Sequence, residues 1–186
     1  MIYLWWIGGA PADGRVLASA GRRLEAEFAR PVRLWTSIER PLDTFDARRQ
    51  QHSSRAVLHW LVEARPAGAS RVLGLTDVDL FMPVLTFVFG EAQLDGVAAV
   101  VSTARLVDAS AAITEARVVT ECVHELGHTF GLLHCETPGC VMTRSASVRA
   151  VDAKRPTLCA LCRQRYRAYD QEGLHVYHED ADSDRR

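Results

Sequence analysis

The sequence lacks any apolar run that approaches the roughly 18 residues a membrane-spanning helix needs. Its apolar N-terminal segment, residues 1–7, is short, has no basic leader and is interrupted by Gly8-Gly9-Ala10-Pro11. A signal peptide has a basic start and a longer apolar core, so this segment is predicted to be a buried first strand. Without an export signal the expected location is the cytoplasm, where cysteines stay reduced and can bind metal.

The sequence also lacks an excess of charge of either sign. It has 22 lysines and arginines against 23 acidic residues, which gives a formal net charge of −1. Four arginines of a predicted helix have Glu25 and Glu27 among them, a pattern typical of a solvated face rather than a phosphate-binding track. We therefore expect no nucleic-acid partner and no membrane partner. There is no internal repeat.

The composition that remains is that of an ordinary globular protein. Hydrophobic residues make up 48% and charged residues 24% of 186 residues, enough to bury a substantial core. Strands alternate with helices, which predicts an α/β (α+β) fold with a mixed twisted sheet and packed helices. Strands are predicted over residues 1–7, 32–35, 71–76, 86–90 and 97–103, helices over 13–29, 54–64, 115–130 and 156–169, and irregular chain over 39–51 and 135–155.

Three histidines near residue 130 have the spacing of a zinc site. His124 and His128 are four positions apart, so on a helix they share one face and can bind one tetrahedral Zn²⁺. Gly131 suits a helix end that needs a left-handed residue, after which the chain can turn and bring His134 to the metal. Three nitrogen ligands leave a fourth position for water, whose pKa zinc lowers from ~15.7 toward ~7.

Glu125 directly follows the first histidine. It can reach a metal-bound water without ligating the metal, take the proton from that water and deliver it to a leaving amine. The short His-Glu-x-x-His core alone could be two surface histidines with an acidic neighbour. Because the full run fixes five positions over eleven residues, we interpret it as a hydrolase site. The polar side of the predicted helix should face the cleft with Arg117, Glu121, His124 and His128.

The cysteines form a second candidate metal site. Cys135-x₄-Cys140 and Cys159-x₂-Cys162 have spacings usable for a Cys₄ structural zinc, which contributes folding energy rather than chemistry. The alternative is one or two disulfides, which would require an oxidising compartment. Cys122 falls on the apolar side of the predicted helix and is expected to be a core residue. The two sets together predict two zinc ions per chain.

The motifs resemble those of a known family. The eleven-residue histidine run followed by Met142 is similar to the signature of the metzincin zinc peptidases. The cysteine spacings narrow this resemblance to the archaemetzincins; it rests mainly on residues 72–165. It implies a zinc-dependent peptidase with Met142 as the floor beneath the zinc, although a methionine without this context is usually core. The positions that carry the narrower resemblance are Cys135, Cys140, Met142, Cys159 and Cys162.

These observations predict a compact metzincin-like protein, expected to be a monomer. Residues 1–131 would form an N-terminal subdomain that ends with the active-site helix. Residues 132–178 would form a smaller subdomain with His134, Met142 and the Cys₄ zinc, and residues 179–186 a frayed tail. A peptide or unfolded protein substrate would lie extended across the cleft and add to an edge strand. The residues expected to bind it are Thr86, Phe87, Val88, Phe89 and Gly90.

Two other functions stay open at this point. The chain could be a non-catalytic zinc protein that binds peptides or partners, or a zinc hydrolase of a small molecule. Glu125 argues against the first alternative, because a purely structural three-histidine site has no use for a base. Nothing in the sequence argues against the second.

Overall fold

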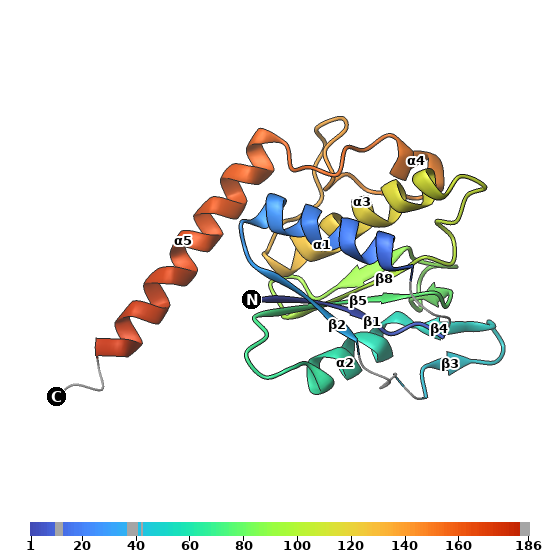
Figure 1. Ribbon diagram of the computed structural model, residues 1–186, viewed down its shortest axis with the longest axis horizontal. Helices are drawn as coiled ribbons and strands as arrows, with labels where there is room; N and C mark the ends of the chain where they lie inside the picture. The colour runs from blue at the N-terminus through green and yellow to red at the C-terminus, as the bar shows by residue number, and fades with distance from the viewer. Residues whose placement is uncertain (10–12, 37–40, 42, 183–186) are drawn as a thin grey trace.

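The computed structural model describes residues 1–9, 13–36, 41 and 43–182 (Figure 1). Its main element is a five-stranded sheet in the order β2-β1-β5-β8-β7. Strands β2, β1, β5 and β8 are parallel, and the edge strand β7 runs antiparallel to β8. The bounds are β1 Ile2–Trp6, β2 Val32–Thr36, β5 Arg71–Thr76, β7 Gly90–Ala92 and β8 Ala98–Ser102.

Helices cover both faces of this sheet. The side chains of Asp13 and Ser53 accept hydrogen bonds from the first turns of α1 and α2, so both helices begin where their sequences predict. A small second sheet has the order β3-β4-β6. The remaining bounds are α1 Gly14–Phe28, α2 Ser54–Ala64, α3 Ala111–Thr129, α4 Val148–Asp152, α5 Ala160–Asp182, β3 Phe45–Asp46, β4 Gln51–Ser53 and β6 Leu80–Phe81.

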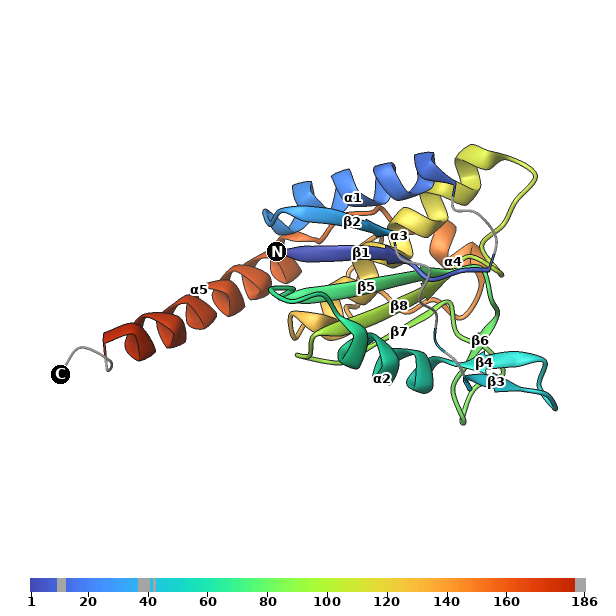
Figure 2. The same cartoon turned by 60° about the horizontal axis from the view of Figure 1, so that its bottom comes forward.

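The sheet separates two apolar cores, because successive side chains of a strand point to opposite faces. From β1, Ile2 and Leu4 pack with α1 and α3, whereas Tyr3 and Trp5 pack with α2. Figure 2 shows α1 and α3 on one side of the sheet and α2 on the other. Cys122 is fully buried in the first core, as predicted. The mixed α/β architecture expected from the sequence is therefore confirmed.

The strand predicted over residues 86–90 is wrong in its position. Only Gly90 of that segment belongs to a strand, and Val88 makes an isolated bridge to Leu80 instead. The turn before β8 sets the register that pairs Ala92 with Ala99 and Gly90 with Val101. The edge strand of the main sheet is thus Gly90–Ala92, with residues 86–89 leading into it as irregular chain.

Other boundaries also differ from prediction. Helix α3 begins at Ala111 with Ser110 as its N-cap residue, while the Thr114 hydroxyl accepts a hydrogen bond from the Asp108 N–H. Strand β3 and helix α4 lie in segments predicted to be irregular; elements this short produce no readable periodicity.

Helix α5 begins four residues later than predicted and extends away from the rest of the molecule (Figures 1 and 2). It continues to Asp182, so the predicted frayed tail begins inside it; residues 183–186 lie outside the described residues. In the described part of the chain, no helix combines the length and apolar character needed to cross a bilayer.

Candidate metal and catalytic site

The C-terminal half of α3 carries the first two histidines. His124 Nδ1 lies 2.7 Å from the Val141 carbonyl oxygen, and His128 Nδ1 lies 2.6 Å from that of Leu132. A carbonyl only accepts hydrogen bonds, so each Nδ1 carries the ring proton and each Nε2 presents a lone pair. The two Nε2 atoms are 3.2 Å apart. The helix and the turn after it therefore aim two lone pairs at one point.

His134 reaches the same point from the turn after α3. Gly131 has a φ of 73°, the left-handed conformation predicted for it, and its N–H donates to the His128 carbonyl at 3.0 Å. The His134 ring centroid lies 5.4 Å from that of His124 and 4.9 Å from that of His128. All three ligand atoms lie within 4.8 Å of one another. The structure thus brings together the histidines that the sequence singles out.

These rings fit a tetrahedral zinc ion in spacing and in protonation. Two nitrogens, each about 2.05 Å from zinc, would be about 3.3 Å apart in a tetrahedron, close to the 3.2 Å between the two Nε2 atoms. Burial is the main cause that lowers the pKa values of His124 and His128. Burial, followed by the charge of His128, lowers the pKa of His134 to about 4. Near neutral pH all three imidazoles are therefore neutral, as metal binding requires.

The Glu125 carboxyl lies between α3 and β7. Glu125 is buried, and a Cβ placed on Gly90 would lie only 2.5 Å from its Cγ. Burial is the main cause that raises the pKa of Glu125 well above its ordinary value, and the negative charge of Glu121 adds to it. Once ionised, a carboxylate with a raised pKa is a stronger base than an exposed one.

Met142 is fully buried beside the histidine-bearing helix. A Cβ placed on Gly127 would meet the Met142 Sδ at 2.7 Å, so the thioether packs against the turn that carries His128. The Met142 carbonyl accepts a hydrogen bond from the Cys135 N–H at 3.0 Å. Met142 therefore joins the histidine site to the first cysteine.

The four cysteines converge on a second point. The Sγ atoms of Cys135 and Cys159 are 3.8 Å apart, as are those of Cys140 and Cys162. A disulfide needs about 2.05 Å between sulfurs, whereas two thiolates about 2.3 Å from one zinc would be about 3.8 Å apart in a tetrahedron. Backbone N–H groups also donate to these sulfurs, for example Cys159 N–H to Cys140 Sγ at 3.4 Å. The donor set fits a closed Cys₄ zinc site and not a disulfide.

A cavity of about 600 Å³ opens at the histidines. The predicted substrate segment, residues 86–90, lines it together with Leu133 and Arg144. Its wall is supported from behind, because the Arg105 guanidinium lies 4.3 Å from the Phe87 ring centroid and donates two 2.7 Å hydrogen bonds to Asp79. A second cavity, of about 780 Å³ between α1, α3 and α4, is lined by none of the three histidines.

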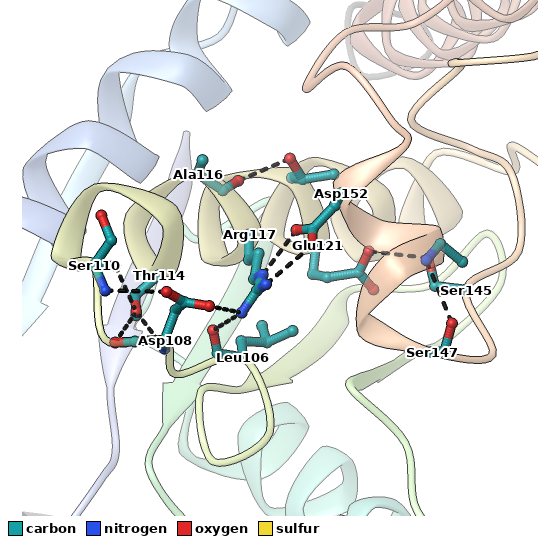
Figure 3. Close-up of polar contacts among 12 residues, drawn as sticks. Leu106, Asp108, Ser110, Thr114, Ala116, Arg117, Glu121, Ser145, Ser147 and Asp152 are labelled. Atoms are coloured by element: carbon teal, nitrogen blue, oxygen red, sulfur yellow. Dashed lines mark hydrogen bonds and ion pairs between the residues drawn. The ribbon is translucent and has the colours of Figure 1, made fainter.

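Ion pairs join α3 to the chain that follows Met142 (Figure 3). Arg117 donates to both oxygens of Asp152, at 2.7 and 2.9 Å, so its predicted position facing the cleft is wrong. One turn further, Glu121 Oε1 lies 3.1 Å from Lys154 Nζ and the two side chains are 2% and 1% exposed. Lys154 Nζ is also 3.5 Å from His124 Nδ1. The first histidine is thus backed by a buried ion pair.

The buried position of Lys154 beside Glu121 was not predicted from the sequence. Lys154 lies in a segment predicted to be irregular, where charged side chains are normally exposed. The one signal that could have identified it is that Lys154 is the only lysine in the chain.

The chain is similar to proteins of known family. The model of the family described as peptidase family M54 matches residues 28–168. An archaemetzincin of Methanopyrus kandleri is 46% identical over 156 residues, covering 81% of this chain and 89% of that protein. Its crystal structure matches with a TM-score of 0.84 at 35% identity, covering 91% of this chain and 94% of that one.

A second solved relative agrees with the first. The crystal structure of the Archaeoglobus fulgidus archaemetzincin, complexed with malonate, matches with a TM-score of 0.76 at 32% identity, covering 88% of this chain and 98% of that chain. The family match spans well over half of the chain, and the curated relative is matched over most of its length. The chain therefore belongs to peptidase family M54, the archaemetzincins, and is a zinc metallopeptidase.

Proposed function

We propose that this peptidase cuts peptide bonds in the cavity at the three histidines. His124, His128 and His134 would hold a catalytic zinc ion, and Glu125 would act as the general base. The observation that carries the proposal is the pair of Nε2 lone pairs 3.2 Å apart, with a buried carboxyl of raised pKa lining the same cavity.

The side chains divide the work of hydrolysis. A bound zinc ion would polarise the scissile carbonyl and make water at the open coordination position more acidic. Glu125 would accept the proton of the attacking water and pass it to the leaving amine; its raised pKa suits both transfers. The carbonyls of Val141 and Leu132 keep the two helix histidines in the tautomer that leaves Nε2 free.

The open edge of β7 offers a place for the substrate backbone. The Phe89 carbonyl accepts a hydrogen bond from the Ser102 N–H, and the Gln93 N–H donates to the Ala98 carbonyl. In an antiparallel pair, successive residues direct their backbone groups alternately toward the neighbouring strand and away from it. The N–H and C=O groups of Gly90 and Ala92 therefore point away from β8, to the open edge. An extended peptide could add there as a further strand, next to Glu125. We therefore propose β7, rather than the whole of residues 86–90, as the pairing edge. Substrates would be flexible or unfolded segments.

We also propose a second, structural zinc ion. Its ligands would be the four cysteines, whose paired sulfurs are 3.8 Å apart. Four thiolates fill the tetrahedron, so this ion would stabilise residues 132–178 and take no part in hydrolysis.

Cleavage of a diverse peptide library by zinc-loaded wild type and by Glu125→Gln tests the catalytic proposal. The variant keeps all three histidines, so its zinc content should equal that of wild type while turnover falls by about 10²–10⁴-fold. Glu136→Gln changes an exposed glutamate that does not line the cavity, and should cut like wild type. Equal cleavage by wild type and Glu125→Gln would assign the activity to a contaminant or to another residue.

A further inference from the structure

One permanent cation lines the catalytic cavity. Among the described residues of its wall, Arg144 is the only arginine or lysine. It is exposed and follows Met142 by two positions. It lines this cavity together with His134 and Glu125. Arg144 therefore lies close to where a substrate would react.

The carboxylates of the same wall are already engaged. Glu121 pairs with Lys154 at 3.1 Å, and Glu91 lies 3.9 Å from the Arg55 guanidinium. The third is the proposed general base. Within the described ranges, Arg144 has no ion-pair partner. Its guanidinium can thus bind an anion that comes from outside the chain.

The backbone on both sides of Arg144 is held in place. The Thr143 hydroxyl donates to the Cys140 carbonyl at 3.0 Å, which ties this segment to the cysteine site. The Ser145 hydroxyl donates to Glu121 Oε1 at 3.4 Å, which ties it to α3 (Figure 3). Arg144 is therefore presented from an anchored segment and not from a free loop.

Three exposed leucines lie at the rim of the same cavity. Leu85, Leu94 and Leu133 line the same cavity and are 49%, 55% and 58% exposed. Large apolar side chains are normally buried, and a group of them around one cavity marks a surface that binds an apolar partner. The rim therefore matches apolar substrate side chains, with one position for a negative charge.

We propose that Arg144 is a specificity-determining residue that binds a substrate carboxylate close to the scissile bond. The favoured substrate is an extended apolar peptide with an acidic side chain, or a free C-terminus, within a residue or two of the cleavage site. Arginine suits this role because its planar guanidinium binds a carboxylate through two parallel hydrogen bonds. This inference rests on the proposed function of the cavity.

A set of matched peptides tests the proposal. Four versions of one peptide that wild type cuts are made. They carry either Glu or Gln beside the scissile bond, and either a free or an amidated C-terminus near it. Wild type should prefer at least one carboxylate form by about tenfold in kcat/KM, as for a partly exposed charge-assisted hydrogen bond. The form that shows the preference identifies the source of the carboxylate.

Substitutions assign the preference to its residue. Arg144→Gln should remove the preference, and Arg144→Lys should retain part of it. Arg149→Gln is the matched control, because Arg149 is exposed on α4 and does not line the cavity; it should keep the full preference. An equal loss of kcat/KM on all four peptides would overturn the proposal and indicate a role in the reaction itself. No change at all would also overturn it.

A binding measurement separates this inference from the proposed function. Fluorescence anisotropy with zinc-loaded Glu125→Gln and labelled peptides should show tighter binding of the carboxylate form. That difference should disappear in Glu125→Gln/Arg144→Gln. If wild type cuts no peptide, the proposed function fails while the anisotropy still decides the role of Arg144. Equal binding of the carboxylate and amide forms would overturn the inference even if peptides are cut.

Discussion

The position of the ring proton on His124 and on His128 determines which nitrogen of each ring can bind a metal ion. Each proton points to a backbone carbonyl, so the opposite nitrogen has a free lone pair with which it would bind the proposed zinc ion. Sequence spacing predicts the histidine pair but not these carbonyls, because Val141 lies 17 residues beyond His124 and is placed only by the folded turn. Orienting partners of this kind typically change metal affinity or activity by about 10–100-fold.

Gly90 is the residue whose substitution should most directly move the base. A methyl group there would lie 2.5 Å from Glu125 Cγ and 2.6 Å from the Val100 carbonyl oxygen, so the β7 backbone or the Glu125 side chain must shift. Gly90→Ala should therefore lower kcat by tenfold or more, since about 1 Å of misplacement can reduce the rate by about 10²-fold. Steady-state kinetics with parallel zinc analysis measures this effect.

The control for Gly90→Ala is Gly14→Ala. A Cβ at Gly14 has no atom within 4 Å, so that variant should retain wild-type kcat. Wild-type kcat in Gly90→Ala would show that Glu125 does not need its present position against β7.

At the scale of elements, a buried ion pair fastens the chain after α4 to α3. Lys154→Met would leave Glu121 buried without a counter-charge, which should cost about 3–5 kcal/mol of unfolding free energy. Lys154→Met/Glu121→Leu removes both charges and should recover most of that loss. Urea unfolding of the two variants gives these values. If the double variant is as unstable as the single one, the cost is one of packing and not of charge.

The two proposed metal sites should differ in how strongly the loss of one ligand destabilises the fold. Cys159→Ser removes one thiolate from the closed site and should lower the melting temperature strongly, because structural zinc contributes on the order of 10 kcal/mol in small metal-folded modules and less beside an existing core. His134→Ala should abolish cleavage and leave the melting temperature nearly unchanged, because His134 is exposed and is not part of the apolar core between α3 and the sheet. Calorimetry of both variants makes the comparison. Equal melting temperatures for wild type and Cys159→Ser would mean that this thiolate contributes little to stability.

Helices and strands could be predicted where the apolar periodicity extends over many consecutive residues. The apolar periodicity and side-chain caps of α1 and α2 predict both helices closely. The predicted strand over residues 86–90 failed because apolar residues there face a cavity rather than a sheet neighbour. Strand β6 and helix α4 depend on long-range pairing and packing, which leave no local signal.

At the scale of the whole molecule, the two proposed ligand sets lie on one short piece of chain. The turn after α3 carries His134 and Cys135 side by side, and the segment after Cys140 returns through Val141, the carbonyl partner of His124, to Met142. Motif spacing was sufficient to predict that the three histidines converge and that the four cysteines converge, because ligand geometry restricts spacing tightly. The ion pairs around them could not be predicted, because Arg117 and Asp152 are 35 positions apart in the sequence and Glu121 and Lys154 are 33 apart.

Zinc content and peptide cleavage, followed together during graded chelation, test the central claim most directly. We expect two zinc ions per fully loaded chain, and the ion at the three histidines should leave first because its coordination is open. Cleavage should fall in proportion to this first equivalent, while the melting temperature changes little until the Cys₄ ion leaves. A stoichiometry of one at full occupancy, or cleavage that survives loss of the first zinc ion, would contradict the account.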